Sequence, residues 1–194
     1  MGRVIQVRII GPRDMRDAHV VDTTSRSRTW SRGLSPFLLG PVRLYKPHVS
    51  MTMENGWQFA KVYRQHIDAK GNPTAAYWEW AQAGWQAFRA ERYPMGKGKK
   101  PLYSVWRKEK LDYIQARKRI YCPLYAHAVM ETVAFAQLRD QYLSSHELTL
   151  WDFDGYDHRA LGMTYDDVLN DRSRKMGHAF VLAMLLEGIH PWEK

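Results

Sequence analysis

Two glycine–proline breaks, at residues 11–12 and 40–41, bound the β-prone stretches that this chain contains before residue 50. The first, residues 4–10 (Val-Ile-Gln-Val-Arg-Ile-Ile), ends at Gly-Pro and predicts a strand. Residues 13–33 are polar and rich in Arg, Ser and Thr, which indicates a long loop or a mobile segment. Two more β-prone stretches, 37–39 and 42–45, flank a second Gly-Pro break. The sheet that these segments imply is small.

After residue 50 the spacing of apolar residues becomes helical. Thr52 is expected to cap a helix that runs to about His66. A second helix is expected at Gly71-Asn72-Pro73, with Asn72 as its N-cap and a buried stripe of Tyr77, Ala81, Trp85 and Phe88. Further helices are expected at about 104–121, 123–143, after Thr164, and 174–187, with an irregular stretch at 144–163. The fold class that follows is mainly α with a small N-terminal β element (α+β).

The length and the composition of the chain favour one compact domain. The chain has 194 residues, and 45% of them are hydrophobic, which is ample for a core. The sequence contains no internal repeat and no low-complexity tract. We therefore expect a single domain over 1–194, in which residues 1–33 supply the N-terminal strand and the loop.

Three features favour a reducing, cytoplasmic setting. The single Cys122 excludes an internal disulfide and a Cys-based zinc site. The apolar run at 179–186 is too short to span a bilayer. The N-terminus lacks the apolar region and cleavage site of a signal peptide. We expect a cytoplasmic protein without a membrane partner, and the sequence does not predict its oligomeric state.

The chain is strongly basic, with a formal net charge of +9 and a pI of about 9.7. A positive field attracts polyanions and speeds their encounter with the protein. The partner that this charge favours bears phosphate, as nucleic acid, a nucleotide or a phosphosugar. A soluble protein that is merely basic is the alternative, and charge alone does not separate these possibilities.

The first candidate site lies on the helix expected after Thr52. Glu54, Gln58 and Lys61 are spaced at i, i+4 and i+7, so they share one helical face. An acceptor, an amide and a cation would then align over two turns. The alternative is a solvated face, in which such pairs contribute only about 0.2–0.5 kcal/mol each.

The second candidate site is the basic loop at residues 91–102. Two glycines allow close approach of the backbone to a ligand, and the cations that surround them are Arg92, Lys97, Lys99 and Lys100. The Gly-Lys-Ser/Thr order of a P-loop is missing. The alternative interpretation is a flexible basic loop without a ligand.

The third candidate site, at residues 148–158, alternates acids with aromatics. An aromatic ring can stack on a base while an acid binds the sugar, and an alternative role for Asp152 and Asp154 is a weak magnesium site. The alternative is a turn with Asx caps. No His pair has zinc-ligand spacing, and no dinucleotide fingerprint is present, so we predict no metal site and no cofactor. A basic stretch at 107–119 offers a further nucleic-acid face or a solvated one.

The order of four motifs resembles the NADAR (YbiA-like) family. Ser35-Pro36-Phe37 is similar to its opening Ser-x-Phe, and residues 54–61 are similar to its Ser-Glu-His-x-x-Gln-x-x-Lys helix. Residues 100–106 (Lys-Pro-Leu-Tyr-Ser-Val-Trp) and 176–180 (Met-Gly-His-Ala-Phe) are similar to its later elements. The match covers residues 34–187, and the resemblance implies a compact NADAR-like core there.

The motifs also depart from the family pattern. Met53-Glu54-Asn55 stands where the family has Ser-Glu-His, and Tyr103 replaces an Arg. Either Trp151 or Asp154 corresponds to the family's Asp-x-x-Trp-Gly element, which leaves two registers open. These departures bear on the substrate more than on the fold.

The resemblance implies an N-glycosidase that hydrolyses a bond between ribose C1 and nitrogen, most simply in ADP-ribose attached to a nucleobase. Such cleavage develops positive charge on the sugar, which a fixed carboxylate stabilises. Glu54 is expected to be catalytic, with Asp152 or Asp154 assisting the leaving group or binding ribose. The expected substrate-binding residues are Gln58, Lys61, Trp57, Trp151, Tyr156, Asp157, Arg92, Lys97, Lys99 and Lys100.

Two other functions fit the same residues. A non-catalytic nucleic-acid-binding protein on this scaffold would use the cations for phosphates and the aromatics for stacking. An enzyme that exchanges or modifies the base of a nucleotide, a sugar–base transferase, is the second. Turnover separates the first of these from hydrolysis, and analysis of the products separates the second.

Overall fold

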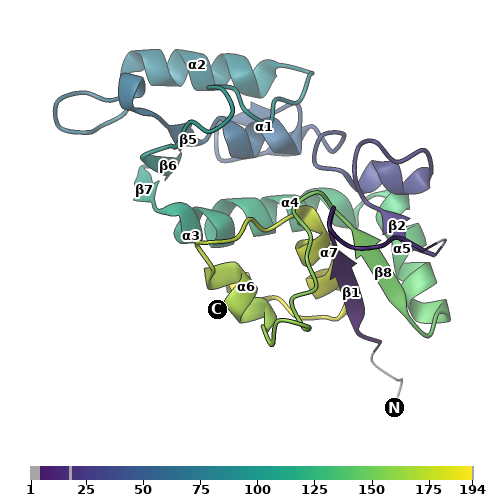
Figure 1. Cartoon of the computed structure of the whole chain (residues 1–194). Coiled ribbons are helices and arrows are strands. Elements are labelled where there is room, and N and C mark those ends of the chain that lie inside the picture. The colour runs from purple at the N-terminus through teal and green to yellow at the C-terminus, as the bar shows by residue number, and fades with distance from the viewer. Residues whose placement is uncertain (1–4, 18, 194) are drawn as a thin grey trace. The chain divides into compact units, whose positions relative to one another are not determined.

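The computed structural model describes residues 5–17 and 19–193, which fall into two compact units (Figure 1). Unit 1 comprises residues 1–35 and 125–194, and unit 2 comprises residues 36–124. Helices and small sheets occur in both units, so the fold is α+β, as expected. Whether the chain behaves as the single domain predicted over 1–194 stays a prediction. The start of the strand predicted at 4–10, and the N-terminal residues considered for a signal peptide, lie outside the described residues.

Unit 1 is built on a three-stranded parallel sheet. Its strand order is β1 (Val7–Ile10), β8 (Leu148–Trp151) and β2 (Val21–Asp22). The apolar side chains of β1 and β8 are almost wholly buried, which is typical of parallel strands covered on both faces. β1 confirms the predicted N-terminal strand, whereas β8 lies within the stretch predicted to be irregular.

Helices of unit 1 pack around this sheet. α7 (His178–Leu186) contacts β1, and seven of its nine residues are buried, which explains why it lacks an amphipathic pattern. Thr164 caps α6 (Tyr165–Asn170) as predicted, and its hydroxyl accepts a hydrogen bond from the Asp167 amide. The remaining helices include α4 (Cys122–Met130), which begins in unit 2, α5 (Val133–Ser144), and the 3₁₀ helices η1 (Trp30–Leu34) and η4 (Pro191–Glu193).

Unit 2 consists of short helices and two small antiparallel sheets. One sheet pairs β3 (Val42–Arg43) with β4 (Val49–Ser50), and the other has the order β5 (Lys61–Val62), β6 (Tyr103–Trp106), β7 (Glu109–Leu111). The helices are α1 (Met53–Gln58), η2 (Arg64–His66), α2 (Ala75–Gln86), α3 (Tyr113–Ala116) and the π-helical turn η3 (Arg117–Tyr121). Its core joins α2 to the second sheet through Phe59, Val62, Tyr77, Ala81, Trp85 and Val105.

The helix predicted from Thr52 to about His66 is much shorter than expected. Thr52 does cap α1, since its hydroxyl accepts a hydrogen bond from the Asn55 amide, but the helix ends at Gln58. The chain then enters β5, where Lys61 pairs with Ser104. Pairing with β6 satisfies backbone groups that a longer helix would have satisfied internally, so tertiary contacts override the helical spacing.

The prediction of a helix over residues 104–121 is wrong for the first half of that range. Residues 103–111 form the β6–β7 hairpin, and Asp112 then starts α3 with a capping box. The two-residue turn of this hairpin, Arg107-Lys108, lacks the Asn-Gly signal that usually identifies such hairpins in a sequence.

Smaller corrections concern α2 and the N-terminal segments. α2 begins after Thr74 rather than at Asn72, and Phe88 lies beyond its end with 82% of its surface exposed. Residues 36–38 form a turn, and residue 39 lies outside any strand. The predicted loop at 13–33 contains β2 and the start of η1, and its buried polar residues include Thr23, Thr24, Ser27 and Ser31. The final helix starts at His178 rather than at 174, and Gly188 follows its end with φ +68°, as its predicted role requires.

Candidate functional site

The site predicted at α1 is buried rather than solvated. All six residues of the helix are buried, and Glu54 and Gln58 expose only 5% and 7% of their surface. A solvated Glu–Gln–Lys ladder is therefore excluded for these two side chains. Burial of a carboxylate requires compensating hydrogen bonds, so its partners define what the site can do.

Glu54, Gln58 and Lys61 form one chain of hydrogen bonds. The Gln58 amide Nε2 donates to Glu54 Oε1 at 2.8 Å, and Lys61 Nζ donates to Gln58 Oε1 at 2.6 Å. The ammonium also lies 4.6 Å from the centre of the Trp57 ring. Because the amide oxygen faces a cation and its nitrogen faces a carboxylate, the orientation of Gln58 is fixed. The carboxylate is thus held in place from the side of Gln58.

Lys61 reaches this chain from a strand, not from the helical face that the spacing predicted. β5 pairs with β6, and the amides of Leu102 and Val105 donate to the carbonyls of Val62 and Ala60. The structure therefore brings residues 54–61 and 100–106, two of the segments singled out in the sequence, side by side in unit 2.

Sequence reasoning missed the structural role of Asn55. Its amide group is fully buried and donates to the carbonyl oxygens of Gly84, Ala87 and Arg89. Its own oxygen accepts a hydrogen bond from the Glu91 amide at 2.8 Å. Asn55 thereby ties α1 to the end of α2 and to the start of the basic loop. The only signal in the sequence is its position next to Glu54.

The basic loop at residues 91–102 is a loop, as predicted, and its lysines face solvent. Lys97, Lys99 and Lys100 are exposed, whereas Arg92 is half-buried, with its guanidinium 5.5 Å from the Tyr93 ring centre. Two turns shape the loop, and Gly96 and Gly98 adopt φ values of +95° and +86°. Binding of phosphate by these cations stays a prediction.

Asp152 belongs to unit 1, where it anchors the start of α7. Its carboxylate accepts hydrogen bonds from His178 Nδ1 at 2.9 Å and from the Ala179 amide at 3.1 Å. Burial would raise the pKa of Asp152, but His178 and the backbone donors outweigh it and lower the pKa to about 2. The carboxyl is ionised at neutral pH, so it can act there as an acceptor.

The neighbours of Asp152 are also engaged within unit 1. Trp151 is 3% exposed, and the Arg16 guanidinium lies 3.3 Å from its ring centre, so a base reaches that face only if Arg16 moves. Asp157 forms an ion pair with Arg8 at 2.9 Å. Burial raises the pKa of Asp157, but the hydrogen bond from the Ala160 amide and the pair with Arg8 outweigh burial and lower this pKa. Asp154 lies 3.9 Å from Lys175 Nζ, and the Tyr156 ring packs against Phe180.

The predicted residues thus form two groups. Glu54, Trp57, Gln58 and Lys61 come together in unit 2, which also holds the basic loop, and residues 151–157 lie in unit 1. A single site that joins Glu54 to the acids of unit 1 stays a prediction. Over the described residues, no group of three or more His, Cys, Asp and Glu side chains is placed to hold a metal ion. No helix in the described part of the chain is long and apolar enough to cross a membrane.

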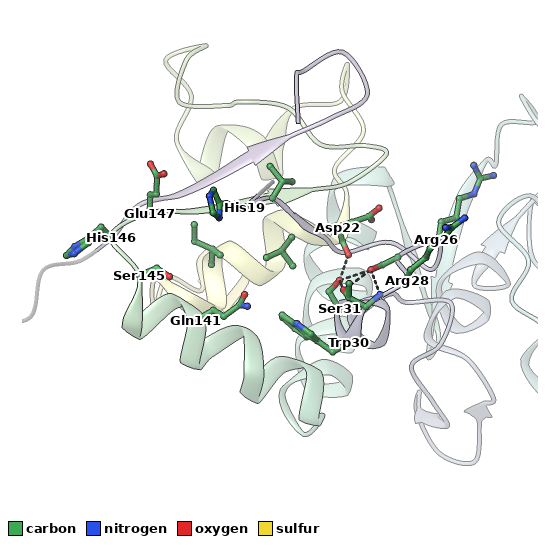
Figure 2. Close-up of a pocket in the computed structure, with 15 residues that line it drawn as sticks. His19, Asp22, Arg26, Arg28, Trp30, Ser31, Gln141, Ser145, His146 and Glu147 are labelled. Carbon is green, nitrogen blue, oxygen red and sulfur yellow. Dashed lines mark hydrogen bonds between the residues drawn. The ribbon is translucent and has the colours of Figure 1, made fainter. Parts of the chain in front are cut away.

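Unit 1 also contains a polar hollow of about 900 Å³ beside β2, η1 and α5 (Figure 2). The hydroxyl groups of Ser27, Thr29 and Ser31 bond to one another at 2.9–3.1 Å, and Ser31 donates to the Asp22 carbonyl at 2.6 Å. Figure 2 shows Ser31 of this cluster on one side of the hollow, with Arg26 and Arg28 further to that side. These hydroxyls satisfy one another, which points to a structural role.

The fold and the site define a basic α+β protein with a buried carboxylate–amide–ammonium chain. A family of unknown function, DUF6939, matches residues 11–181, and the chain belongs to that family. No curated protein and no solved structure matches the chain.

Proposed function

We propose that this protein hydrolyses the bond between ribose C1 and nitrogen, with Glu54 as its catalytic carboxylate. The substrate we propose is ADP-ribose attached to a base of nucleic acid. The proposal includes a NADAR-like core over residues 34–187, in keeping with the motif order in the sequence. Because the proposed catalysis depends on the Glu54 carboxylate, a single substitution at this residue tests it.

The observation that carries the proposal is the hydrogen-bonded chain Glu54–Gln58–Lys61. A carboxylate with 5% exposure, held by an amide that is itself held by an ammonium, has little freedom to reorient. Catalysis by stabilisation of charge depends on such preorganisation, because a fixed group needs no rearrangement as charge develops. A surface glutamate in a solvated ladder would lack this property.

In the proposed reaction, the C1–N bond breaks and its electron pair leaves with the base. The Glu54 carboxylate stabilises the positive charge that grows on the ribose. It also accepts a proton from water as the water oxygen bonds to C1, and that proton is then passed, directly or through solvent, to the departing nitrogen, which regenerates the carboxylate. Gln58 and Lys61 act as positioning residues, because Gln58 holds the Glu54 carboxylate directly and Lys61 holds Gln58. The exposed lysines of the basic loop supply charge for the diphosphate.

The test compares Glu54→Gln with the wild-type protein on an oligonucleotide that carries ADP-ribose on guanine or thymine. The substitution keeps the side-chain volume and removes the charge and the basic oxygen. Released ADP-ribose is quantified by chromatography, and we expect the rate to fall by at least about 100-fold, the scale of general acid–base catalysis.

Glu79→Gln is the matched control, because Glu79 is an exposed glutamate of α2 in the same unit. It should release ADP-ribose at the wild-type rate. Wild-type activity in Glu54→Gln, with the fold unchanged by circular dichroism, contradicts the proposal. Transfer of ADP-ribose to another base instead of water would point to the exchange reaction.

A further inference from the structure

A second feature of unit 2 is an aromatic cleft of about 710 Å³. We call it the aromatic cleft; its walls are Tyr45, His48 and Trp78, and its cations are Lys46, Arg107 and Lys108. The remaining lining residue is Gln82, so no acidic side chain lines the cleft. The volume is within the range of small-molecule sites, and the lining combines flat rings with positive charge.

The rings of the aromatic cleft are fixed by the core of the unit. The Tyr45 ring packs edge-on against Trp106, with centroids 5.0 Å apart, and against the buried Trp85 at 6.4 Å. His48 and Trp78 lie nearly parallel, with an interplanar angle of 12°. Burial lowers the pKa of His48, so this ring is neutral at pH 7 and acts as a flat surface rather than as a cation. Tyr45, His48 and Trp78 are each half-buried, so part of each ring remains accessible.

Two of the cations, Arg107 and Lys108, form a tight hairpin turn, where Arg and Lys are uncommon. Trp106 pairs with Glu109, which leaves Arg107 and Lys108 as the two-residue turn between β6 and β7. Arg107 has φ +57°, a left-handed conformation that Asn and Gly adopt more readily. The turn geometry therefore does not explain Arg-Lys at these positions. Both side chains are exposed, and both line the cleft.

The positive charge of the chain is concentrated in the unit that contains this cleft. Residues 36–124 include 16 Lys and Arg against 6 Asp and Glu, a formal net charge of +10 with His neutral. The other residues include 13 Lys and Arg against 14 Asp and Glu. A polyanion is therefore attracted to unit 2 and not to the chain as a whole.

We infer that the aromatic cleft binds single-stranded nucleic acid, with an unpaired base on its rings and the adjoining phosphates on Lys46, Arg107 and Lys108. Stacking requires a base face, which a duplex hides between neighbouring base pairs and a single strand exposes. An acidic peptide would use the cations but has no flat group for Trp78. The charge extends well beyond the cleft, which suits a strand with many phosphates better than one free nucleotide.

This binding site goes beyond the proposed hydrolysis and does not depend on it. The cleft residues take no part in the Glu54–Gln58–Lys61 chain. Strand binding therefore tests the cleft, and release of ADP-ribose tests Glu54. The two proposals can fail separately.

The experiment measures fluorescence anisotropy of a labelled mixed-sequence 20-nucleotide DNA strand with the full-length protein. Arg107→Asn/Lys108→Gly removes both charges, and Asn adopts the left-handed conformation of position 107 more readily than Arg does. Trp78→Ala removes the stacking face. Arg64→Gln/Lys70→Gln is the matched control, since it removes one exposed Arg and one exposed Lys of the same unit away from the cleft.

We expect Trp78→Ala to weaken binding of the strand by at least about fivefold, the effect of losing one stacked base. Arg107→Asn/Lys108→Gly should weaken it similarly and lower the slope of log affinity against log salt by about 1.4, or roughly 0.7 for each lost phosphate contact. The control pair should bind within twofold of wild type, and a duplex of the same sequence should bind more weakly than the strand.

Several results would overturn the inference. The cleft is not the site if the control pair weakens binding as much as Arg107→Asn/Lys108→Gly, or if Trp78→Ala has no effect. The occupant is wrong if a duplex or poly-glutamate binds as tightly as the strand. Competition by a mononucleotide is compared with competition by unlabelled strand at equal total nucleotide concentration. Equal displacement of the labelled strand would show that the cleft binds a single nucleotide and not a strand.

Discussion

At the scale of single residues, Asp152 and His178 form a buried ion pair whose protonation follows from its neighbours. His178 Nδ1 contacts the Asp152 carboxylate at 2.9 Å, and its Nε2 contacts the Thr23 carbonyl oxygen at 2.8 Å. Both of these neighbours accept hydrogen bonds and neither donates, so both ring nitrogens carry a proton. The pair links the ends of β2 and β8 to the first residues of α7. The Asp152 carboxylate lies at the N-terminus of that helix, where the positive end of the helix dipole stabilises a negative charge.

This pair predicts a dependence of stability on acid. The folded pKa of Asp152, about 2, lies below the ordinary value of about 3.9, so its ionised form stabilises the fold. That stabilisation is present above about pH 5 and is lost as the pH falls towards 2, with a magnitude on the order of 2 kcal/mol. Urea unfolding at several pH values should show that Asp152→Asn is destabilised at pH 6 and that its difference from wild type shrinks towards pH 2. A difference that does not change with pH would contradict this account.

At the scale of elements, close packing between α2 and the chain after α1 depends on one glycine. Gly84 is buried in α2, and a Cβ at this position would collide with the Phe59 ring. Phe59 is 5% exposed and belongs to the core of unit 2. The missing side chain of Gly84 is therefore the space that the ring fills.

Gly84→Ala should destabilise the protein although alanine is the better helix former by about 1 kcal/mol. The collision forces either the ring or the helix to shift, a cost of about 1–3 kcal/mol for overpacking. Thermal unfolding of Gly84→Ala, Phe59→Leu and the double variant measures the coupling. We expect the alanine to cost less when Phe59 is leucine, and equal costs in the two backgrounds would show that the ring is not the cause.

The elements also show what the sequence could predict. Local signals sufficed for the caps at Thr52 and Thr164 and for the end of α7 at Gly188, because these depend on residues within one turn. They failed at β5, which pairs with residues about 40 positions further along the chain, and at the β6–β7 hairpin, whose turn lacks the usual Asn-Gly signal. The Glu54–Gln58 contact followed from helical spacing, whereas the structural roles of Asn55 and Asp152 depend on distant backbone groups.

At the scale of the whole molecule, unit 2 is one continuous segment with its own core and most of the positive charge. Its 89 residues contain the cluster around Phe59, Tyr77 and Trp85 without a contribution from the rest of the chain. A segment of this length can bury enough apolar surface to fold alone. The single domain expected from length and composition is thus open to a direct test.

We predict that a fragment of residues 36–124 folds independently. Its circular dichroism spectrum should contain the helical signal of α1 and α2, and urea should unfold it in one cooperative transition. A fragment that is unfolded in the absence of urea would show instead that 1–194 is one cooperative domain, as the totals indicate.

The central claim is that Glu54 directs water to ribose C1, and the most direct measurement traces the oxygen of that water. Wild-type protein is incubated with an ADP-ribosylated oligonucleotide in ¹⁸O-labelled water, and released ADP-ribose is analysed by mass spectrometry before it exchanges with solvent. We expect ADP-ribose with one ¹⁸O at C1 from wild type and from Glu79→Gln, and almost none from Glu54→Gln. Labelled product at the same rate from Glu54→Gln, or no release by wild type, would contradict the claim.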